Sequence, residues 1–248
     1  MMKKVIKTGL PEIDAVLGGG LINRGNLLIS YDRRSLGWVL ALKIFKNLLN
    51  QIGVGVIFNT TLPLSKLKLR AGYLGIDFDE EGSKGNLYII DILGSKYDIP
   101  QNESYVYQIK DWSDETALPK LIRLYQELAT KIPKDKIIIG LVATLEGLYH
   151  EFGERFMNNT IKASLASFEK GELKKLNMVT ISLLNREAVP HHITAWLYSL
   201  SDQIIEFTSQ MTPEGLKETV VIPKSLLPGF RTKCYTMKIS EKEEVTLF

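Results

Sequence analysis

The chain has 248 residues, of which 45% are hydrophobic and 24% charged, a composition typical of a globular protein with a substantial core. Its net charge of +3 is too small to indicate nucleic-acid or membrane binding, and its single cysteine excludes an internal disulfide framework. No apolar run is long enough to span a membrane, and no apolar stretch follows the basic residues at the start. We therefore expect a cytoplasmic protein without a signal peptide.

The first fifty residues predict a short helix, a strand and a long helix. Pro11 is typical of a first helical turn, and the glycines at 18–20 end that helix. Residues 26–31 form a continuous apolar run of strand length, as expected for a strand covered on both faces. Residues 36–51 are apolar on most sides and predict a largely buried helix.

The alternation of strands and helices continues and then changes. Further strands are predicted at 54–59, 87–92, 136–143 and 178–184, and helices at 64–74, 114–131 and 146–170. Beyond them the pattern predicts strands without helices, at 194–199, 203–208, 218–222, 234–239 and 244–247. This order predicts an α/β fold with parallel crossovers and antiparallel strands added at one edge. We expect one domain over 1–248, with an arm (1–25), a core (26–209) and a β extension (210–248).

Residues 8–25 carry the most specific motif, Thr-Gly-Leu-Pro-Glu-Ile-Asp-Ala-Val-Leu-Gly-Gly-Gly-Leu-Ile-Asn-Arg-Gly. This string resembles the segment that precedes the phosphate loop in RecA-like ATPases of the KaiC/RadA branch. The stretches at 40–42 (Leu-Ala-Leu) and 200–205 (Leu-Ser-Asp-Gln-Ile-Ile) also resemble that family. The resemblance implies a RecA-like fold, with a mostly parallel central sheet flanked by helices.

The resemblance also places a phosphate loop where this chain has none of the expected residues. Aligned without a gap, the loop's three glycines fall on Tyr31, Arg34 and Leu36, its lysine on Gly37 and its magnesium-binding hydroxyl on Trp38. Bulky side chains are disfavoured at positive φ and would crowd a pyrophosphate. The resemblance therefore implies a degenerate phosphate loop, formed by Tyr31, Asp32, Arg33, Arg34, Ser35, Leu36, Gly37 and Trp38.

Two further positions of the family's active site differ. Gly140 stands where the metal-binding acid should end the fourth strand, and Thr61 stands at the catalytic glutamate position. A threonine cannot act as a general base near neutral pH. We therefore expect no catalytic residues, no metal and no cofactor, and leave open weak binding of ATP or ADP.

Several charged residues have both a functional and a structural interpretation. Arg33 and Arg34 lie beside a predicted helix N-terminus, where they would bind an anion or an acidic partner, or form a solvated turn. Asp32 would cap that helix or pair with either arginine, and Tyr31 and Trp38 would fill the vacated pocket. In the loop after the fifth strand, Arg186, His191 and His192, together with Lys174, are candidate DNA or subunit contacts or ordinary surface residues.

The favoured hypothesis is a catalytically inactive RecA/KaiC-like protein that works by regulation or assembly. Its partners would be copies of itself or active paralogues, contacted through residues 8–23 and the late edge strands. One alternative is a DNA-binding protein similar to the RadA paralogues that assist recombination. Another is an enzyme with different chemistry in the same crevice, at the carboxyl ends of the parallel strands.

Overall fold

The computed structural model describes residues 5–51, 53–167, 169, 174, 176–213, 215–239 and 245–247. The chain divides into two compact units, one formed by Met1–Gln51 with Val179–Phe248 and the other by Ile52–Met178. Both ends of the chain therefore belong to the first unit. The prediction of one domain with an arm, a core and an extension stays a prediction, because a compact unit need not be a separate domain.

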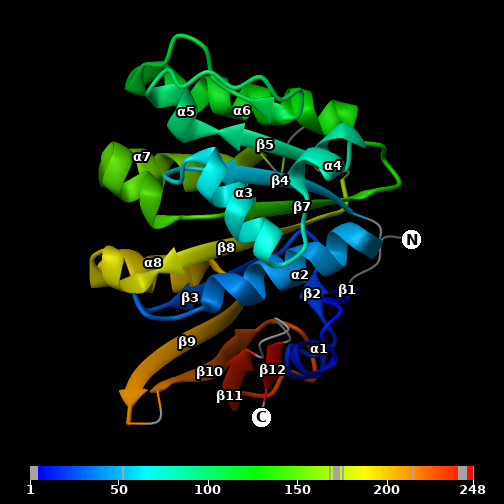
Figure 1. Ribbon diagram of the computed structural model, residues 1–248, viewed down its shortest axis with the longest axis vertical. Coiled ribbons are helices and arrows are strands. Elements are labelled where there is room, and N and C mark those ends of the chain that lie inside the picture. The colour runs from blue at the N-terminus through cyan, green and yellow to red at the C-terminus, as the bar shows by residue number, and fades with distance from the viewer. Residues whose placement is uncertain are drawn as a thin grey trace. The chain divides into compact units, whose positions relative to one another are not determined.

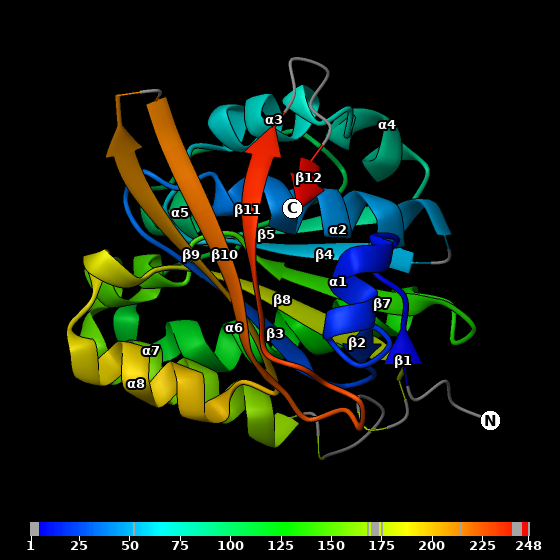
Figure 2. The same cartoon turned by 90° about the horizontal axis from the view of Figure 1, so that it is seen from below.

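The first unit combines parallel and antiparallel strands. Strand β3 lies between β8 and β9 and is parallel to both, whereas β9, β10, β11 and β12 follow one another in antiparallel order. Figures 1 and 2 show β9 and β10 as a long hairpin, in orange. The elements are β1 (Val5–Ile6), α1 (Pro11–Val16), β2 (Leu21–Ile22), β3 (Asn26–Tyr31), α2 (Gly37–Gln51), β8 (Met178–Asn185), the 3-10 turn η2 (Arg186–Ala188), α8 (His191–Leu200), β9 (Gln203–Thr212), β10 (Gly215–Ser225), β11 (Lys233–Ile239) and β12 (Val245–Leu247).

Burial explains the arrangement of the first unit. The four central residues of β3, Leu27–Ser30, are buried, as the continuous apolar run predicts for a strand covered on both faces. Helices α2 and α8 lie on opposite faces of β3 and β8 (Figure 2). Helix α2 buries nine of its residues, among them Leu40, Ile44 and Phe45.

The second unit is a parallel sheet with helices on both faces. Its strand order is β7-β4-β5-β6, and each neighbouring pair is parallel. Helices α3 and α4 lie on one face of this sheet and α6 and α7 on the other (Figure 2). The elements are β4 (Gly53–Asn59), α3 (Leu64–Tyr73), α4 (Phe78–Ser83), β5 (Leu87–Asp91), α5 (Ile92–Lys96), β6 (Val106–Tyr107), α6 (Asp114–Lys131), β7 (Ile137–Val142) and α7 (Glu146–Ser167).

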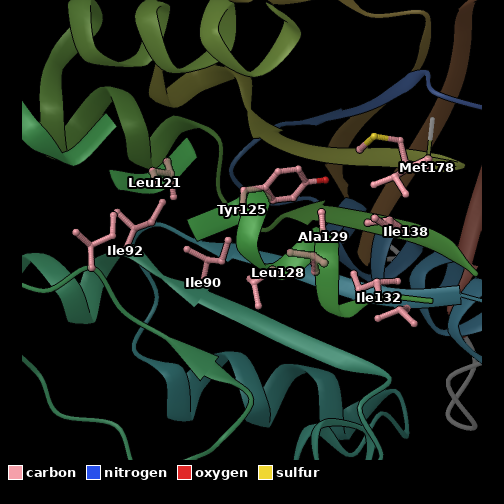
Figure 3. Packing of buried hydrophobic residues seen from close by; sticks show 13 residues of the cluster. Ile90, Ile92, Leu121, Tyr125, Leu128, Ala129, Ile132, Ile138 and Met178 are labelled. Carbon is pink, nitrogen blue, oxygen red and sulfur yellow. The ribbon is translucent and has the colours of Figure 1, made fainter. Parts of the chain in front are cut away.

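A cluster of apolar side chains joins α6 to the sheet of the second unit. Leu121, Tyr125 and Leu128 on α6 pack in one cluster with Ile90 and Ile138 on the strands (Figure 3). Positions 121, 125 and 128 recur at helical spacing and so share one face of α6. Ser113 caps this helix by accepting a hydrogen bond from the amide of Thr116.

Two sequence predictions about local structure are wrong or incomplete. Residues 194–199 lie in α8 and not in a strand, because Ile193 and Leu197, four positions apart, are both buried on one helix face. The predicted helix over 146–170 is interrupted at Gly153, which has φ 79° and ψ 169°, and the described helix ends at Ser167.

The predicted α/β class is confirmed, with mostly parallel strands flanked by helices and antiparallel strands near the C-terminus. In the part of the chain that the structure describes, no helix is both long and apolar enough to cross a membrane.

Candidate functional site

The loop of residues 32–36 connects β3 to α2 in the first unit. It stands at the position where the resemblance implies a phosphate loop. In the described part of the chain, the non-glycine residues with positive φ are Arg24, Asp98 and Asp111, so none belongs to this loop. Gly37 begins α2, and a Cβ built on it would lie 3.0 Å from the Cβ of Tyr31 and 3.1 Å from the ring of Phe207. Close packing therefore leaves no room for a side chain at position 37. Trp38 and Tyr31 are half-buried, whereas Arg33 and Arg34 are exposed.

The first amides of the loop donate to acceptors of the chain itself. The amide of Arg33 donates to Glu187 Oε2 (3.4 Å), and that of Arg34 to Asp32 Oδ1 (3.1 Å). The amide of Ser35 donates to the carbonyl oxygen of Asp32 (3.1 Å). Carboxylates thus accept two of these three amide hydrogen bonds.

Glu218, on β10, accepts hydrogen bonds from one amide and one hydroxyl at the start of α2. Its Oε1 accepts a hydrogen bond of 2.8 Å from the amide of Leu36 and a short one from the hydroxyl of Ser35. The Ser35 hydroxyl oxygen in turn accepts from the amide of Gly37 at 3.0 Å. Glu218 is only 4% exposed, and this burial raises the pKa of its carboxyl, although the bonds from Ser35 and Leu36 oppose the change. The chain therefore supplies its own anion where a helix N-terminus favours negative charge.

Asp32 is a second buried carboxylate in this site. Its side chain accepts from the amide of Ser209 at 2.6 Å and from the hydroxyl of the same residue. Burial opposes the ionisation of Asp32, yet the hydrogen bonds from Ser209 and Arg34 and the charge of Arg186 hold its pKa below the ordinary value. Asp32 thus bonds to the backbone of Arg34, and its ion pair is with Arg186, at 3.9 Å. The side chain of Arg33 pairs instead with Glu187, at 3.7 Å.

Thr61, at the expected glutamate position, belongs to a group of hydroxyls in the second unit. Its Oγ1 lies 2.8 Å from Thr144 Oγ1, which lies 2.6 Å from Thr60 Oγ1. A Cβ on Gly147 would lie 2.4 Å from Thr60 Oγ1, so this group is tightly enclosed. The hydroxyls satisfy one another and provide no acid or base.

Gly140 lies inside β7 rather than at its end. It pairs with Val56 of β4, and β7 continues to Val142. The strand predicted at 136–143 is observed at Ile137–Val142, so the position expected for the metal-binding acid falls two residues before the strand ends. The residues that follow β7 are Ala143 and Thr144, so an acidic side chain stands at neither place.

Of the four candidate contacts for DNA or a subunit, Arg186, His191 and His192 belong to the first unit and Lys174 to the second. Arg186 is engaged within its unit, donating from Nη1 to the carbonyl oxygen of Phe207 and from Nη2 to Thr208 Oγ1 (3.1 Å). His191 and His192 are exposed in the first turn of α8, not in a loop. Lys174 is exposed and belongs to the second unit.

Asp91 is a site residue that the sequence analysis does not single out. It ends β5 and is 1% exposed. Its Oδ1 accepts from Asn59 Nδ2 (2.9 Å) and from the amide of Gly94 (3.2 Å), and its Oδ2 accepts from Gln108 Nε2 (3.3 Å). The signal for it was an acidic residue within the last two positions of the strand predicted at 87–92. Ligands of parallel sheets bind beyond the carboxyl ends of the strands.

Comparison with solved structures defines the class of fold, which is RecA/KaiC-like. One similar structure is the uncharacterized protein PH0321 from Pyrococcus horikoshii, in complex with an unknown peptide. It has a TM-score of 0.83 and 16% identity, over 98% of this chain and 99% of that one. Another is the KaiC-like protein PH0186 from the hyperthermophilic archaeon Pyrococcus horikoshii OT3, with a TM-score of 0.71 and 14% identity over 98% of each chain. No protein-family model and no curated protein matches the chain.

Proposed function

We propose that this protein is a catalytically inactive RecA/KaiC-like protein that acts as a regulatory or assembly subunit. It neither hydrolyses nor strongly binds ATP. Its phosphate loop is degenerate, and glycine replaces the metal-binding acid. Its partners are polypeptides, either copies of itself or active paralogues, and it works in the cytoplasm.

The hydrogen bonding of the loop at 32–36 is the observation that carries this proposal. A phosphate loop binds by directing unpaired amides at the phosphates, and a lysine neutralises their charge. Here the amides of residues 33–37 already have acceptors, and the carboxylates of Asp32, Glu187 and Glu218 supply three of these acceptors. A triphosphate would have to displace these carboxylates or approach them against charge repulsion. Gly37 provides no cation to offset that cost.

A polypeptide partner has one precedent among similar structures, since PH0321 was solved in complex with an unknown peptide. The long hairpin of β9 and β10 carries two exposed apolar residues near its tip for such a contact. Met211 and Leu216 face each other across this hairpin and are both exposed. An exposed pair of this kind fits a protein contact better than a catalytic role.

Calorimetry with Mg-ATP and Mg-ADP, together with phosphate release, tests the proposal. We expect no heat of binding at nucleotide concentrations up to about 1 mM and no turnover. Micromolar affinity or magnesium-dependent hydrolysis would overturn it. Light scattering of the pure protein, alone and with an active paralogue, then tests for assembly.

The DNA-binding alternative is an outcome that the same protein preparation can reveal. Binding to single-stranded DNA that weakens with salt, and with Arg186→Ala and Lys174→Ala, would replace the proposal. We expect no binding at low salt, because two donor groups of Arg186 and its charge are already engaged within the chain.

A further inference from the structure

A pocket of about 250 Å³ lies in the second unit, beyond the carboxyl ends of β4 and β5. Residues of α3, the end of β5, the helix α5 and three residues beyond it, Ile99, Gln101 and Glu103, line it. It shares no residue with the loop at 32–36 or with the threonine group. Its volume suits one side chain or a small organic molecule rather than a nucleotide.

Asp91 gives the pocket a buried carboxylate in a fixed orientation. The three hydrogen bonds from Asn59, Gly94 and Gln108 hold it in place. A carboxylate has about four acceptor positions, so these bonds leave one position available on Oδ2. A Cβ on Gly94 would lie only 2.1 Å from that oxygen and 2.2 Å from Gln108 Nε2, so the glycine is needed for Asp91 and Gln108 to keep these positions.

Among the charged residues that line the pocket, Lys68 is the cation. Its ammonium group is already paired with two carboxylates. Its Nζ donates to Glu103 Oε1 (2.7 Å) and to Asp79 Oδ1 (2.9 Å). The ammonium of Lys68 holds the pKa of both carboxyls below their ordinary values. One ammonium thus faces the carboxylates of Asp79 and Glu103, and Asp91 adds a third negative group, so negative charge is in excess.

Apolar side chains complete the lining. Leu64 of α3 and Leu93 of α5 line the pocket, as does Ile99, which is 43% exposed. An alkyl chain would bury apolar surface against these residues while a charged end group reaches the carboxylates.

We propose that this pocket binds an ammonium or guanidinium group carried on an alkyl chain. Such a group is presented by a lysine or arginine side chain of a polypeptide or by a free alkylamine. The polypeptide source rests on the proposed function of partner binding, whereas the affinity of the pocket for the cation does not. A protein that binds Mg-ATP could still bind the cation here, so the two proposals fail in different experiments.

Titration with matched small probes tests the pocket. The probes are Nα-acetyl-arginine methylamide, its uncharged citrulline counterpart and pentylamine, followed by calorimetry and by amide chemical shifts. We expect the arginine probe and pentylamine to shift the amides of Gly94 and Gln101, and the citrulline probe to bind at least about tenfold more weakly. Equal binding of the arginine and citrulline probes, or shifts confined to other residues, would overturn the proposal.

Two lysine-paired glutamates provide a matched pair of variants. Glu103→Gln removes a charge at the pocket and leaves Lys68 paired with Asp79, and Glu151→Gln removes the same charge from a glutamate paired with Lys96 elsewhere. We expect Glu103→Gln to weaken arginine-probe binding about threefold to tenfold and Glu151→Gln to leave it unchanged. An equal effect of both variants would contradict the assignment.

A basic pentapeptide distinguishes the two sources of the cation. Binding at least about tenfold tighter than that of pentylamine, still dependent on Glu103, assigns the site to a polypeptide. Equal affinities assign it to a free amine. No detectable binding of any cationic probe overturns the site altogether.

Discussion

The loop at 32–36 in the first unit and the pocket beside Asp91 in the second both follow parallel strands, but they differ in how their polar groups are satisfied. In the loop, the amides of residues 33–37 all donate to the chain's own acceptors. In the pocket, the carboxylates outnumber the one cation that lines it, and open volume remains. The contrast shows that the family resemblance of a segment does not by itself locate the ligand. Binding capacity depends on which polar groups remain without an internal partner.

The largest effect expected from a single substitution is at Gly94. Gly94→Ala places a methyl group 2.1 Å from Asp91 Oδ2 and 2.2 Å from Gln108 Nε2, so we expect a loss of about 3 kcal/mol in the free energy of unfolding. Urea unfolding measures it. Gly72→Ala is the matched control, because nothing lies within 4 Å of its Cβ, and a helical alanine there should be neutral or slightly stabilising. Similar changes in unfolding free energy for both glycines would mean that Asp91 and Gln108 can move to accommodate the added methyl group.

Glu218→Ala tests how much the internal anion stabilises the loop. The substitution removes the acceptor of the Leu36 amide and the Ser35 hydroxyl, so we expect a loss of about 2 kcal/mol in unfolding free energy. The exposed neighbour Lys217→Ala should change stability by less than about 0.5 kcal/mol. A Glu218→Ala variant as stable as the wild type would show that the loop does not depend on this carboxylate.

The pH dependence of stability sharpens the same comparison. Because burial raises the pKa of Glu218 in the folded protein, its contribution is fully present below pH 4.5, the ordinary value, and is lost as the pH rises through the folded pKa. The Glu218→Gln variant does not lose stability in this way. The free energy of unfolding of the variant, relative to that of the wild type, should therefore increase between pH 4.5 and neutral pH. The increase amounts to about 1.4 kcal/mol for each unit of pKa difference. Urea unfolding at a series of pH values measures it, and a constant or falling difference would be inconsistent with a raised pKa.

The smallest effect is expected where the loop meets solvent. Arg33 and Glu187 pair at 3.7 Å with side chains that are 71% and 49% exposed. Such a pair contributes little, so Arg33→Ala should change unfolding free energy by less than about 0.5 kcal/mol. Thermal unfolding at low and high salt checks this. A larger loss would mean that the exposed arginine belongs to the network around Asp32.

The sequence predicts more of the fold than of the site. Continuous apolar runs such as Asn26–Tyr31 identify strands of a parallel sheet that is covered on both faces. The length of the run and its lack of alternation are enough to recognise them. Residues 194–199 could not be assigned in the same way, since a short apolar segment fits either a strand or a helix until its buried face is known. Glu218 could not be predicted as the partner of Ser35, because 183 residues separate them and one sequence carries no signal of that pairing. The position of Asp91 at a strand end was visible, but its fixed orientation depends on Gln108, which comes from another segment.

The amide of Leu36 offers the most direct measurement, because its resonance reports whether Glu218 or a ligand occupies the start of α2. Amide chemical shifts are followed while Mg-ATP is added to the wild type and to Glu218→Gln. With the wild type we predict no saturable shift of Leu36 up to about 1 mM nucleotide, and with Glu218→Gln a changed starting position. A Leu36 resonance that shifts and saturates at micromolar Mg-ATP in the wild type would contradict the account.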